Sequence, residues 1–235
     1  MVPIPLNDNI RRQVFWFSTI ALITANVLVF AYELSLGPTI NRFILSFGLI
    51  PARYTTTHGA IIVTSLATFL VPVFTSMFIH GGWLHLIGNM LFLFVFGRSI
   101  EDRFGHGRFL LLYFLSGFGA AIVDILFNMG SRVPTIGASG AIAGILGAYL
   151  VSFPTARITT LIPLFIFFWT FRIPALLVLG YWFVIQFIAG YQMLAIESAT
   201  RGGVAWWAHV GGFLLGMLMA LTMPKRKTRT AQVWP

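Results

Sequence analysis

The sequence predicts an all-α polytopic membrane protein, and two properties of the chain carry this prediction. The chain has 235 residues, of which 58% are hydrophobic and only 9% are charged. Soluble globular domains carry about 25% charged residues, so this chain has too few charges to cover a surface that faces water. The second property is a series of apolar runs, which with their flanks approach the roughly 20 residues needed to cross a bilayer.

We expect six spanning helices. The runs are Phe15–Tyr32, Leu84–Phe96, Phe109–Phe127, Ala138–Phe153, Ile173–Gly190 and Val204–Met223. A further apolar stretch, Ile158–Phe171, is cut off from the next run by Arg172-Ile173-Pro174, and we predict an interfacial or re-entrant piece there. A seven-span arrangement is the alternative. The long Glu33–Trp83 segment has prolines, glycines and apolar stretches, which predicts a first loop embedded in the membrane interface.

The basic residues indicate the orientation. With six spans and both ends inside, 11 of the 15 lysines and arginines fall on inner segments, and a seventh span would place the C-terminal KRKTR cluster outside. The positive-inside rule therefore favours cytoplasmic termini. We expect one membrane domain over residues 1–235, with short tails at about 1–12 and 224–235, in a bacterial inner (plasma) membrane.

Composition also narrows the function classes. The net charge of +9 does not indicate a nucleic-acid partner, because the basic residues punctuate apolar runs instead of forming one solvated patch. The chain has no cysteine, which excludes disulfides, thiol catalysis and cysteine metal sites. The expected partners are membrane lipids and other membrane proteins.

Polar residues gather at one predicted depth. The second, fourth and sixth spans all start at the outer face, and each opens with polar residues: His80, His85 and Asn89, then Ser139, then His209. Ionisable groups at membrane depth are costly and by default indicate function. Each has a structural alternative, since serine can serve helix packing, asparagine can bond between helices, and a histidine can be a satisfied core residue. Their convergence favours a site.

These residue types fit covalent hydrolysis. Ser139 can serve as the nucleophile and His209 as the general base. His85 and Asn89 are four residues apart on one helix face, so both can donate to an oxyanion, joined by the free backbone N–H of Ser139 at a helix start. Asp124 is the one plausible triad acid, and we favour a Ser–His dyad. We expect Glu101 and Asp102 to form salt bridges with neighbouring arginines at the inner side.

Small residues at four-residue spacing predict that the fourth and sixth spans pack closely. The sixth span has Ala208, Gly212 and Gly216, and the fourth has Gly140 and Gly144. Such stripes let helix backbones approach in lipid. Because each stripe begins beside one of the two candidate catalytic residues, close packing would bring their side chains together.

The stretches HGGWLHLIGNMLFLFVFG, EDRFG, GASGAIAG and AHVGGFLLG, in this order, resemble the rhomboid family of intramembrane serine proteases in its compact six-span form. The resemblance implies a nucleophile at Ser139, a base at His209, and an oxyanion hole from His85, Asn89 and the Ser139 backbone. It also implies supporting roles for His80, Gly137 and Gly140, a membrane-embedded first loop, and a fifth span that gates substrate entry. No cofactor or metal is implied.

The chain departs from the family pattern at one position near the base His209. Some rhomboids carry a tyrosine four residues after the nucleophile, where this chain has Ala143, so we expect Trp206 or Trp207 to hold His209 instead. The sequence thus predicts cleavage of single-span membrane proteins near their outer end. Two alternatives stay open: a proteolytically inactive membrane quality-control or binding protein of the same fold, and a transporter with histidines along a cation path.

Overall fold

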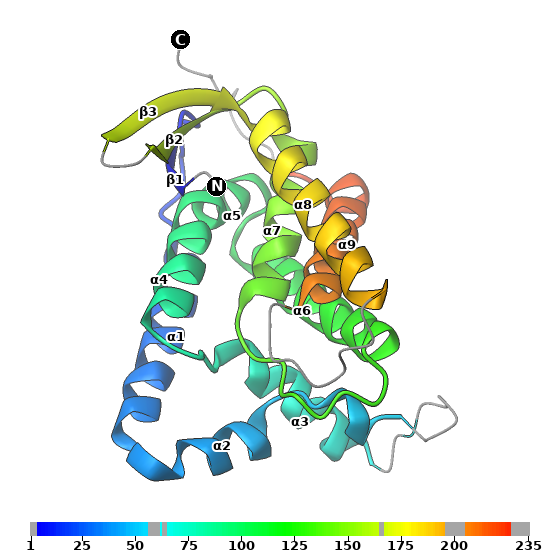
Figure 1. Cartoon of the computed structure of the whole chain (residues 1–235). Helices are drawn as coiled ribbons and strands as arrows, with labels where there is room; N and C mark the ends of the chain where they lie inside the picture. The colour runs from blue at the N-terminus through cyan, green and yellow to red at the C-terminus, as the bar shows by residue number, and fades with distance from the viewer. Residues whose placement is uncertain (1–3, 56–61, 63–64, 165–166, 196–204, 227–235) are drawn as a thin grey trace.

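The structure, a computed structural model, describes residues 4–55, 62, 65–164, 167–195 and 205–226. Within these residues, six helical segments at the predicted positions lie side by side as a bundle (Figure 1). They are α1 (Phe17–Ser35), α4 (Trp83–Phe92) continued by η4 (Leu93–Gly97) and α5 (Arg98–Phe104), α6 (His106–Phe127), α7 (Ser139–Ser152), α8 (Ala175–Ala195) and α9 (Trp206–Thr222). The six-helix prediction is therefore confirmed.

Length and burial divide these helices into two kinds. Four segments are long and apolar enough to cross a bilayer: Phe17–Ser35, Trp83–Phe104, His106–Phe127 and Ala175–Met193. The helices α7 and α9 are shorter, and α7 lies at the centre of the packing. Every residue from Gly140 to Tyr149 is buried, so α7 is enclosed by protein on all sides. Its lack of amphipathic patterning follows, because a helix that is apolar all round is a buried one.

The helices α7 and α9 approach closely because small residues line both. A Cβ built at Gly212 would overlap the carbonyl oxygen of Gly140, and one built at Gly216 would overlap that of Gly144. At the start of α9, the carbonyl oxygen of Ala208 lies 3.9 Å from a Cβ built at Gly140. Backbone thus packs on backbone along the two stripes, which fixes the start of α7 against the start of α9.

The first loop packs at one end of the bundle. It contains η1 (Gly37–Thr39), α2 (Ile40–Phe47), η2 (Pro51–Arg53), α3 (Leu66–Thr75) and η3 (Ser76–Phe78). Leu49, Tyr54 and Val73 form a small core with Ala121 and Ile125 of α6. Figure 1 shows α2 and α3 beneath the helices, at the end opposite the strands.

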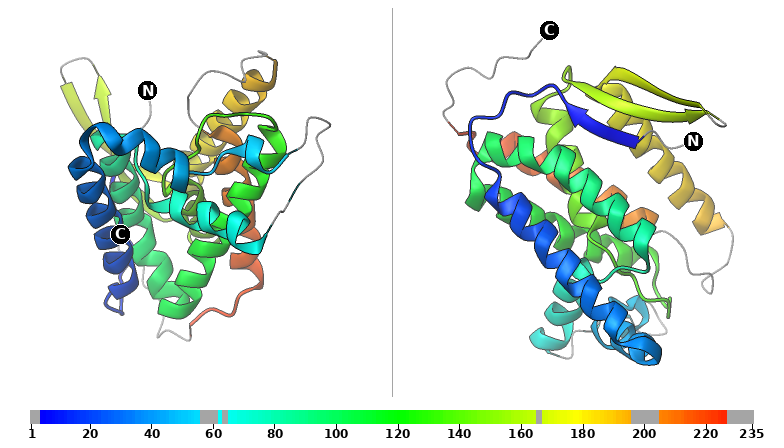
Figure 2. Two further views of the ribbon diagram at one scale, coloured as in Figure 1. Left: turned by 90° about the horizontal axis from the view of Figure 1, so that it is seen from below. Right: turned by 90° about the vertical axis from the view of Figure 1, so that its left-hand side faces the viewer.

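A three-stranded antiparallel sheet covers the other end, which we call the sheet end. The strands are β1 (Ile4–Asp8), β2 (Arg157–Leu164) and β3 (Phe167–Pro174), in the order β1-β2-β3 (Figure 2). The sheet was not expected, and the stretch Ile158–Phe171 forms a β-hairpin and not a re-entrant piece. Its β-branched and aromatic residues suit strands, and β1 supplies a partner from the distant N-terminal segment.

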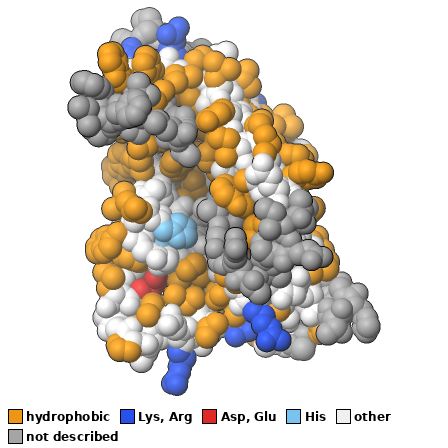
Figure 3. Space-filling model, viewed as in Figure 1, with side chains coloured by type: hydrophobic (Ala, Val, Ile, Leu, Met, Phe, Trp, Pro, Cys, Tyr) orange, Lys and Arg blue, Asp and Glu red, His pale blue; other side chains and the backbone are white. Residues whose placement is uncertain are grey.

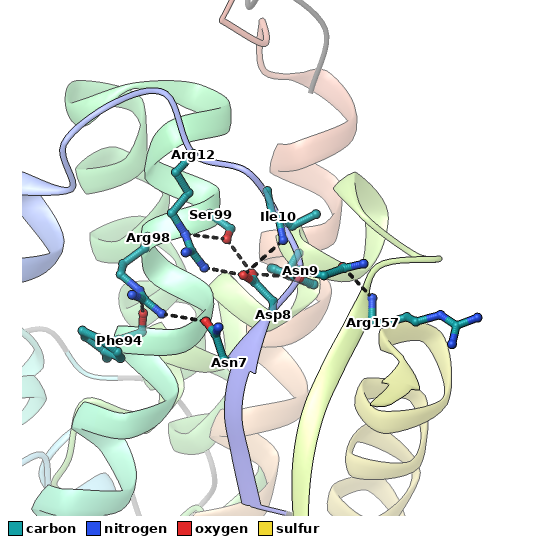
Figure 4. Close-up of polar contacts among 10 residues, drawn as sticks. Asn7, Asp8, Asn9, Ile10, Arg12, Phe94, Arg98, Ser99 and Arg157 are labelled. Atoms are coloured by element: carbon teal, nitrogen blue, oxygen red, sulfur yellow. Dashed lines mark hydrogen bonds and ion pairs between the residues drawn. The ribbon is translucent and has the colours of Figure 1, made fainter. Parts of the chain in front are cut away.

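A buried carboxylate ties β1 to the helices (Figure 4). Asp8 is 6% exposed and accepts hydrogen bonds from Ser99 of α5 at 2.5 Å and from the hydroxyl of Tyr149 of α7 at 3.0 Å. Arg12 pairs with the same carboxylate. Because a buried charge needs such partners, this cluster fixes the N-terminal segment to α5 and α7.

Two further carboxylates bind backbone N–H groups at the start of α1 and just before it. The N–H groups of Ser18 and Thr19 donate to Glu101 at 2.7 and 2.8 Å, and two N–H groups of residues 13–14 donate to Asp102. Negative charge suits a helix N-terminus. The predicted salt bridges with the neighbouring arginines were wrong: among the described ion pairs, the partner of Glu101 is a histidine.

Candidate active site

The loop before α7 is hydrogen-bonded to the first loop at two places. Leu49 and Thr135 exchange backbone hydrogen bonds of 3.1 and 2.7 Å, which join this loop to the first loop. The N–H of Gly137 donates to the carbonyl oxygen of Ser76 at 2.8 Å. These bonds position the residues that lead into the N-terminus of α7.

Asp124 anchors the same loop from α6. Its carboxylate is fully buried and accepts from the hydroxyl of Thr135 and from the side-chain amide of Asn128, each at 2.7 Å. Neither partner is His209. Asp124 therefore has a structural position in the described site, and it does not reach the base as a triad acid would.

The starts of α7 and α9 bring a serine and a histidine together. Ser139 is the first residue of α7, and His209 lies in the first turn of α9. The hydroxyl oxygen of Ser139 and Nε2 of His209 are 2.7 Å apart, within hydrogen-bonding distance. His209 is 7% exposed, so its ring faces protein and the cavity described below.

The other ring nitrogen of His209 contacts a residue that the sequence analysis missed. Nδ1 lies 2.7 Å from the side-chain oxygen of Gln186 on α8, and Gln186 is itself buried. The ring of Trp182, one turn earlier on α8, lies 5.8 Å from that of His209. The expectation for the tryptophans needs correction, because Trp206 only meets the imidazole edge-on at 6.5 Å and Trp207 stacks on Phe127.

This arrangement has a sequence reason. Ala143 stands one turn after Ser139 and is fully buried, so it leaves no aromatic ring beside the base from α7. The space is taken from α8 by Gln186 and Trp182. A polar glutamine in an otherwise apolar spanning helix was the signal that could have identified this residue.

His85 and Asn89 lie beside the loop that leads to Ser139. A Cβ built at Gly137 would lie 2.6 Å from Nε2 of His85 and 3.7 Å from Nδ2 of Asn89. Within the described part of the chain, this Asn89 nitrogen is buried and has no hydrogen-bond partner. An unsatisfied donor in a polar cleft is available to an incoming acceptor.

His80 lies behind His85 and does not line the cavity. Its N–H donates to the carboxylate of Glu33 at the end of α1, and its ring lies edge-on to His85 at 5.1 Å. Nδ1 of His80 contacts the carbonyl oxygen of Phe78 at 3.1 Å. His80 thus supports the ring of His85 and connects α1 to the turn before α4.

A cavity of about 720 Å³ joins these groups. Ser139, His209, His85, Asn89 and Gln186 all line it. Its apolar walls come from α4, α7 and α8, and include Leu84, Phe92, Ile142, Leu146 and Trp182. Figure 3 shows a histidine side chain in a hollow between hydrophobic flanks. A nucleophile, a base and free donors therefore face one space, which is the arrangement that acyl transfer needs.

Comparisons with known proteins point to one family. The family model described as "Rhomboid domain" matches residues 67–226. The chain is 29% identical over 230 residues to RHOMBOID-like protein 1 of Arabidopsis thaliana, covering 88% of this chain and 54% of the relative. It is 30% identical over 218 residues to Rhomboid protein 1, mitochondrial, of Saccharomyces cerevisiae, covering 90% and 55%.

A shorter match concerns a bacterial protein. The chain is 43% identical over 76 residues to Rhomboid protease GluP of Bacillus subtilis, covering 32% of this chain and 14% of that protein. The chain spans about half the length of the Arabidopsis and yeast relatives that it matches.

Proposed function

Because the chain belongs to the rhomboid family, we propose that it is an intramembrane serine endopeptidase that cleaves single-span membrane proteins. The observation that carries the proposal is the 2.7 Å contact between the hydroxyl of Ser139 and Nε2 of His209. A nucleophile within hydrogen-bond reach of an oriented base is the signature of covalent hydrolysis. The cavity beside this pair gives a peptide bond access to it.

The first half of the reaction forms an acyl-enzyme. The Ser139 oxygen attacks the scissile carbonyl carbon while its proton passes to Nε2 of His209. The negative charge that develops on the carbonyl oxygen is stabilised by donors from Asn89, His85 and the N–H of Ser139, which is free because it lies in the first turn of α7. His209 then gives the proton to the leaving amine, and the peptide bond breaks.

The second half uses water. His209 accepts a proton from a water molecule, which attacks the ester carbon, and the acid product leaves as Ser139 recovers its proton. A substrate helix has to unwind at the cavity, because an intact helix keeps its carbonyl groups hydrogen-bonded internally. We therefore expect substrates with small or helix-breaking residues near the cleavage point.

The orientation is part of the proposal. The sheet end gathers basic residues: Arg12, Arg98, Arg103, Arg157, Arg172 and Arg226 lie on β1, β2, β3, α5 or segments bonded to them. The positive-inside rule supports a cytoplasmic position for this end. The site then lies near the outer face, together with α2 and α3, and cleavage occurs there.

The test is cleavage of a generic single-span substrate by the purified full chain in liposomes. Ser139→Ala and His209→Ala are compared with the parent, and Ser152→Ala, at the far end of the same helix, is the matched control. We expect cleavage by the parent and the control only, and covalent labelling of Ser139 by a fluorophosphonate probe. Undiminished cleavage by Ser139→Ala would refute the proposal. Absence of both cleavage and labelling would favour a binding protein that retains the fold.

A further inference from the structure

The environment of His209 contains one group whose role goes beyond the dyad. His209 contacts Ser139 through Nε2 and Gln186 through Nδ1, each at 2.7 Å. The three side chains thus form a chain of hydrogen bonds from α7 through α9 to α8. Asp124 is hydrogen-bonded to Thr135 and Asn128, so it is not part of this chain of hydrogen bonds.

The chemistry of the amide oxygen fixes the proton on the ring. The contacting atom of Gln186 is Oε1, which can only accept, so Nδ1 of His209 has to carry the hydrogen. In a neutral imidazole, Nε2 is then the unprotonated nitrogen. This is the nitrogen that faces Ser139 and can accept its proton.

Burial makes this hydrogen bond important. Gln186 and His209 are 6% and 7% exposed, so little water is available to replace the amide oxygen as partner for Nδ1. Without that partner, the opposite tautomer gains population, because its Nε2–H can donate to the Ser139 oxygen. A ring in that tautomer cannot act as the base. The ring also loses the contact that fixes its rotation about χ2.

The geometry points to Gln186 as a positioning residue, which holds His209 in the tautomer and orientation that the proposed proteolytic reaction requires. The role of Gln186 in catalysis rests on the proposed function. The tautomer of His209 does not, because it can be measured whether or not the protein is a protease. Gln186 acts through His209 and does not touch the reacting atoms.

The helix α8 also takes part in the site, because it carries Gln186. This helix is the least buried of the four long spans, and its residues Trp182 and Gln186 form one wall of the cavity. A substrate that enters beside α8 reaches a competent base only while Gln186 remains within hydrogen-bonding distance of His209. The position of α8 and the state of the base are therefore coupled.

The experiment uses the full chain in liposomes and three substitutions on α8. Gln186→Met keeps the length of the side chain and removes the acceptor, and Gln186→Glu keeps an acceptor oxygen. Gln192→Met is the matched control, because it makes the same change at an exposed position of the same helix. The measurements are kcat and KM for a single-span substrate, fluorophosphonate labelling of Ser139, and the ring ¹⁵N spectrum, with His209 assigned through His209→Ala.

We expect Gln186→Met to lower kcat and the labelling rate about ten-fold or more, as the loss of one orienting hydrogen bond implies, with little change in KM. The His209 spectrum should change from one Nδ1–H tautomer to a mixture. Gln186→Glu should retain the single tautomer and most of the activity, and Gln192→Met should match the parent.

Parent-like kcat and a single tautomer in Gln186→Met would overturn the inference while leaving the proteolytic function intact. If the parent neither cleaves nor labels, the proposed function fails, and the ring spectrum still decides the hydrogen bond. A tautomer mixture in the parent would then refute the role of Gln186. If Gln186→Met does not fold, the spectra of the parent and of Gln186→Glu decide instead. A mixture of tautomers in either protein would refute the role of Gln186.

Discussion

The backbone of Gly137 lies directly against the imidazole of His85, so closely that a Cβ at this glycine would lie 2.6 Å from Nε2. Gly137 also has φ +118°, in the region that side chains rarely adopt. Two residues later comes Ser139, at the start of α7. The glycine thus lets the loop pass close enough to α4 to bring the serine and His85 to one cavity.

Gly137→Ala is expected to reduce activity strongly, because the added methyl group must displace His85 or the loop that carries Ser139. Gly130→Ala is the matched control: Gly130 also has a positive φ, +78°, but a Cβ there would meet nothing within 4 Å. Alanine at positive φ costs about 1 kcal/mol or more at Gly130, which is near the left-handed region, and more at Gly137, whose φ lies beyond that region. Cleavage rates in liposomes would distinguish them, and equal losses would show that strain alone matters.

Asn89→Leu is expected to lower kcat by about 10²- to 10³-fold, the loss typical of removing one oxyanion donor. The reason is that the buried Asn89 nitrogen has no partner among the described residues, while Asn89 itself lines the cavity. Single-turnover cleavage would measure the chemical step, and KM should change little. A loss confined to KM would instead place Asn89 in substrate binding.

The sequence was sufficient for the helices and for four polar residues of the cavity, Ser139, His209, His85 and Asn89, because each signal there is local. Apolar runs of membrane length predict spans, and polar residues at the start of a span stand out against lipid-facing neighbours. The stripes containing Gly212 and Gly216 predicted contact with the fourth span, and in the structure they meet Gly140 and Gly144 backbone to backbone.

The sequence was insufficient where a partner comes from far along the chain. Gln186 reaches His209 only because α8 packs beside α9, and a lone glutamine in a spanning helix does not show which residue it meets. The strand β2 pairs with β1 across about 150 residues, so the hairpin resembled an interfacial apolar stretch. Glu101 likewise finds its partners at the start of α1, and not among nearby arginines.

Proteolysis is expected to decline as the pH falls, because a protonated His209 cannot accept the proton of Ser139. The active form is the neutral one, so the activity is present on the alkaline side and is lost toward acid. His85 also lines the cavity, and His80 packs edge-on against it, so a positive charge on either ring would oppose protonation of His209 and would not promote it. The check is kcat as a function of pH.

The pH prediction has a control at the other end of the molecule. His106 pairs with Glu101 at the sheet end, far along α6 from the cavity. The variant His106→Gln should therefore keep the parent's pH profile. A rate that stays constant into acid pH in the parent would contradict a histidine base.

Tyr149→Phe is expected to destabilise the protein without altering the dyad. The hydroxyl of this fully buried tyrosine donates to Asp8 at 3.0 Å, and a hydrogen bond to a charged group contributes about 1.5–3 kcal/mol. Tyr181→Phe, at a position 48% exposed on α8, is the control and should have no effect. The midpoint of thermal unfolding in detergent would report the difference, with fluorophosphonate labelling unchanged below it. Equal midpoints would show that the Asp8 cluster does not need this donor.

Gly216→Ala is expected to separate α7 from α9 and so weaken the site from a distance. A Cβ at Gly216 would overlap the backbone of Gly144, which cannot rotate away as a side chain could. Overpacking of this kind costs about 1–3 kcal/mol, and helix displacement would lengthen the contact between Ser139 and His209.

The matched change is Gly180→Ala on α8, where a Cβ would meet nothing within 4 Å. Alanine also has the higher helix propensity, so this control should be neutral or slightly stabilising. Thermal unfolding in detergent and the rate of fluorophosphonate labelling are measured for both variants. We expect Gly216→Ala to lower both quantities and Gly180→Ala to lower neither. If Gly216→Ala unfolds at a lower temperature but labels at the parent's rate, the stripe stabilises the bundle without setting the distance within the dyad.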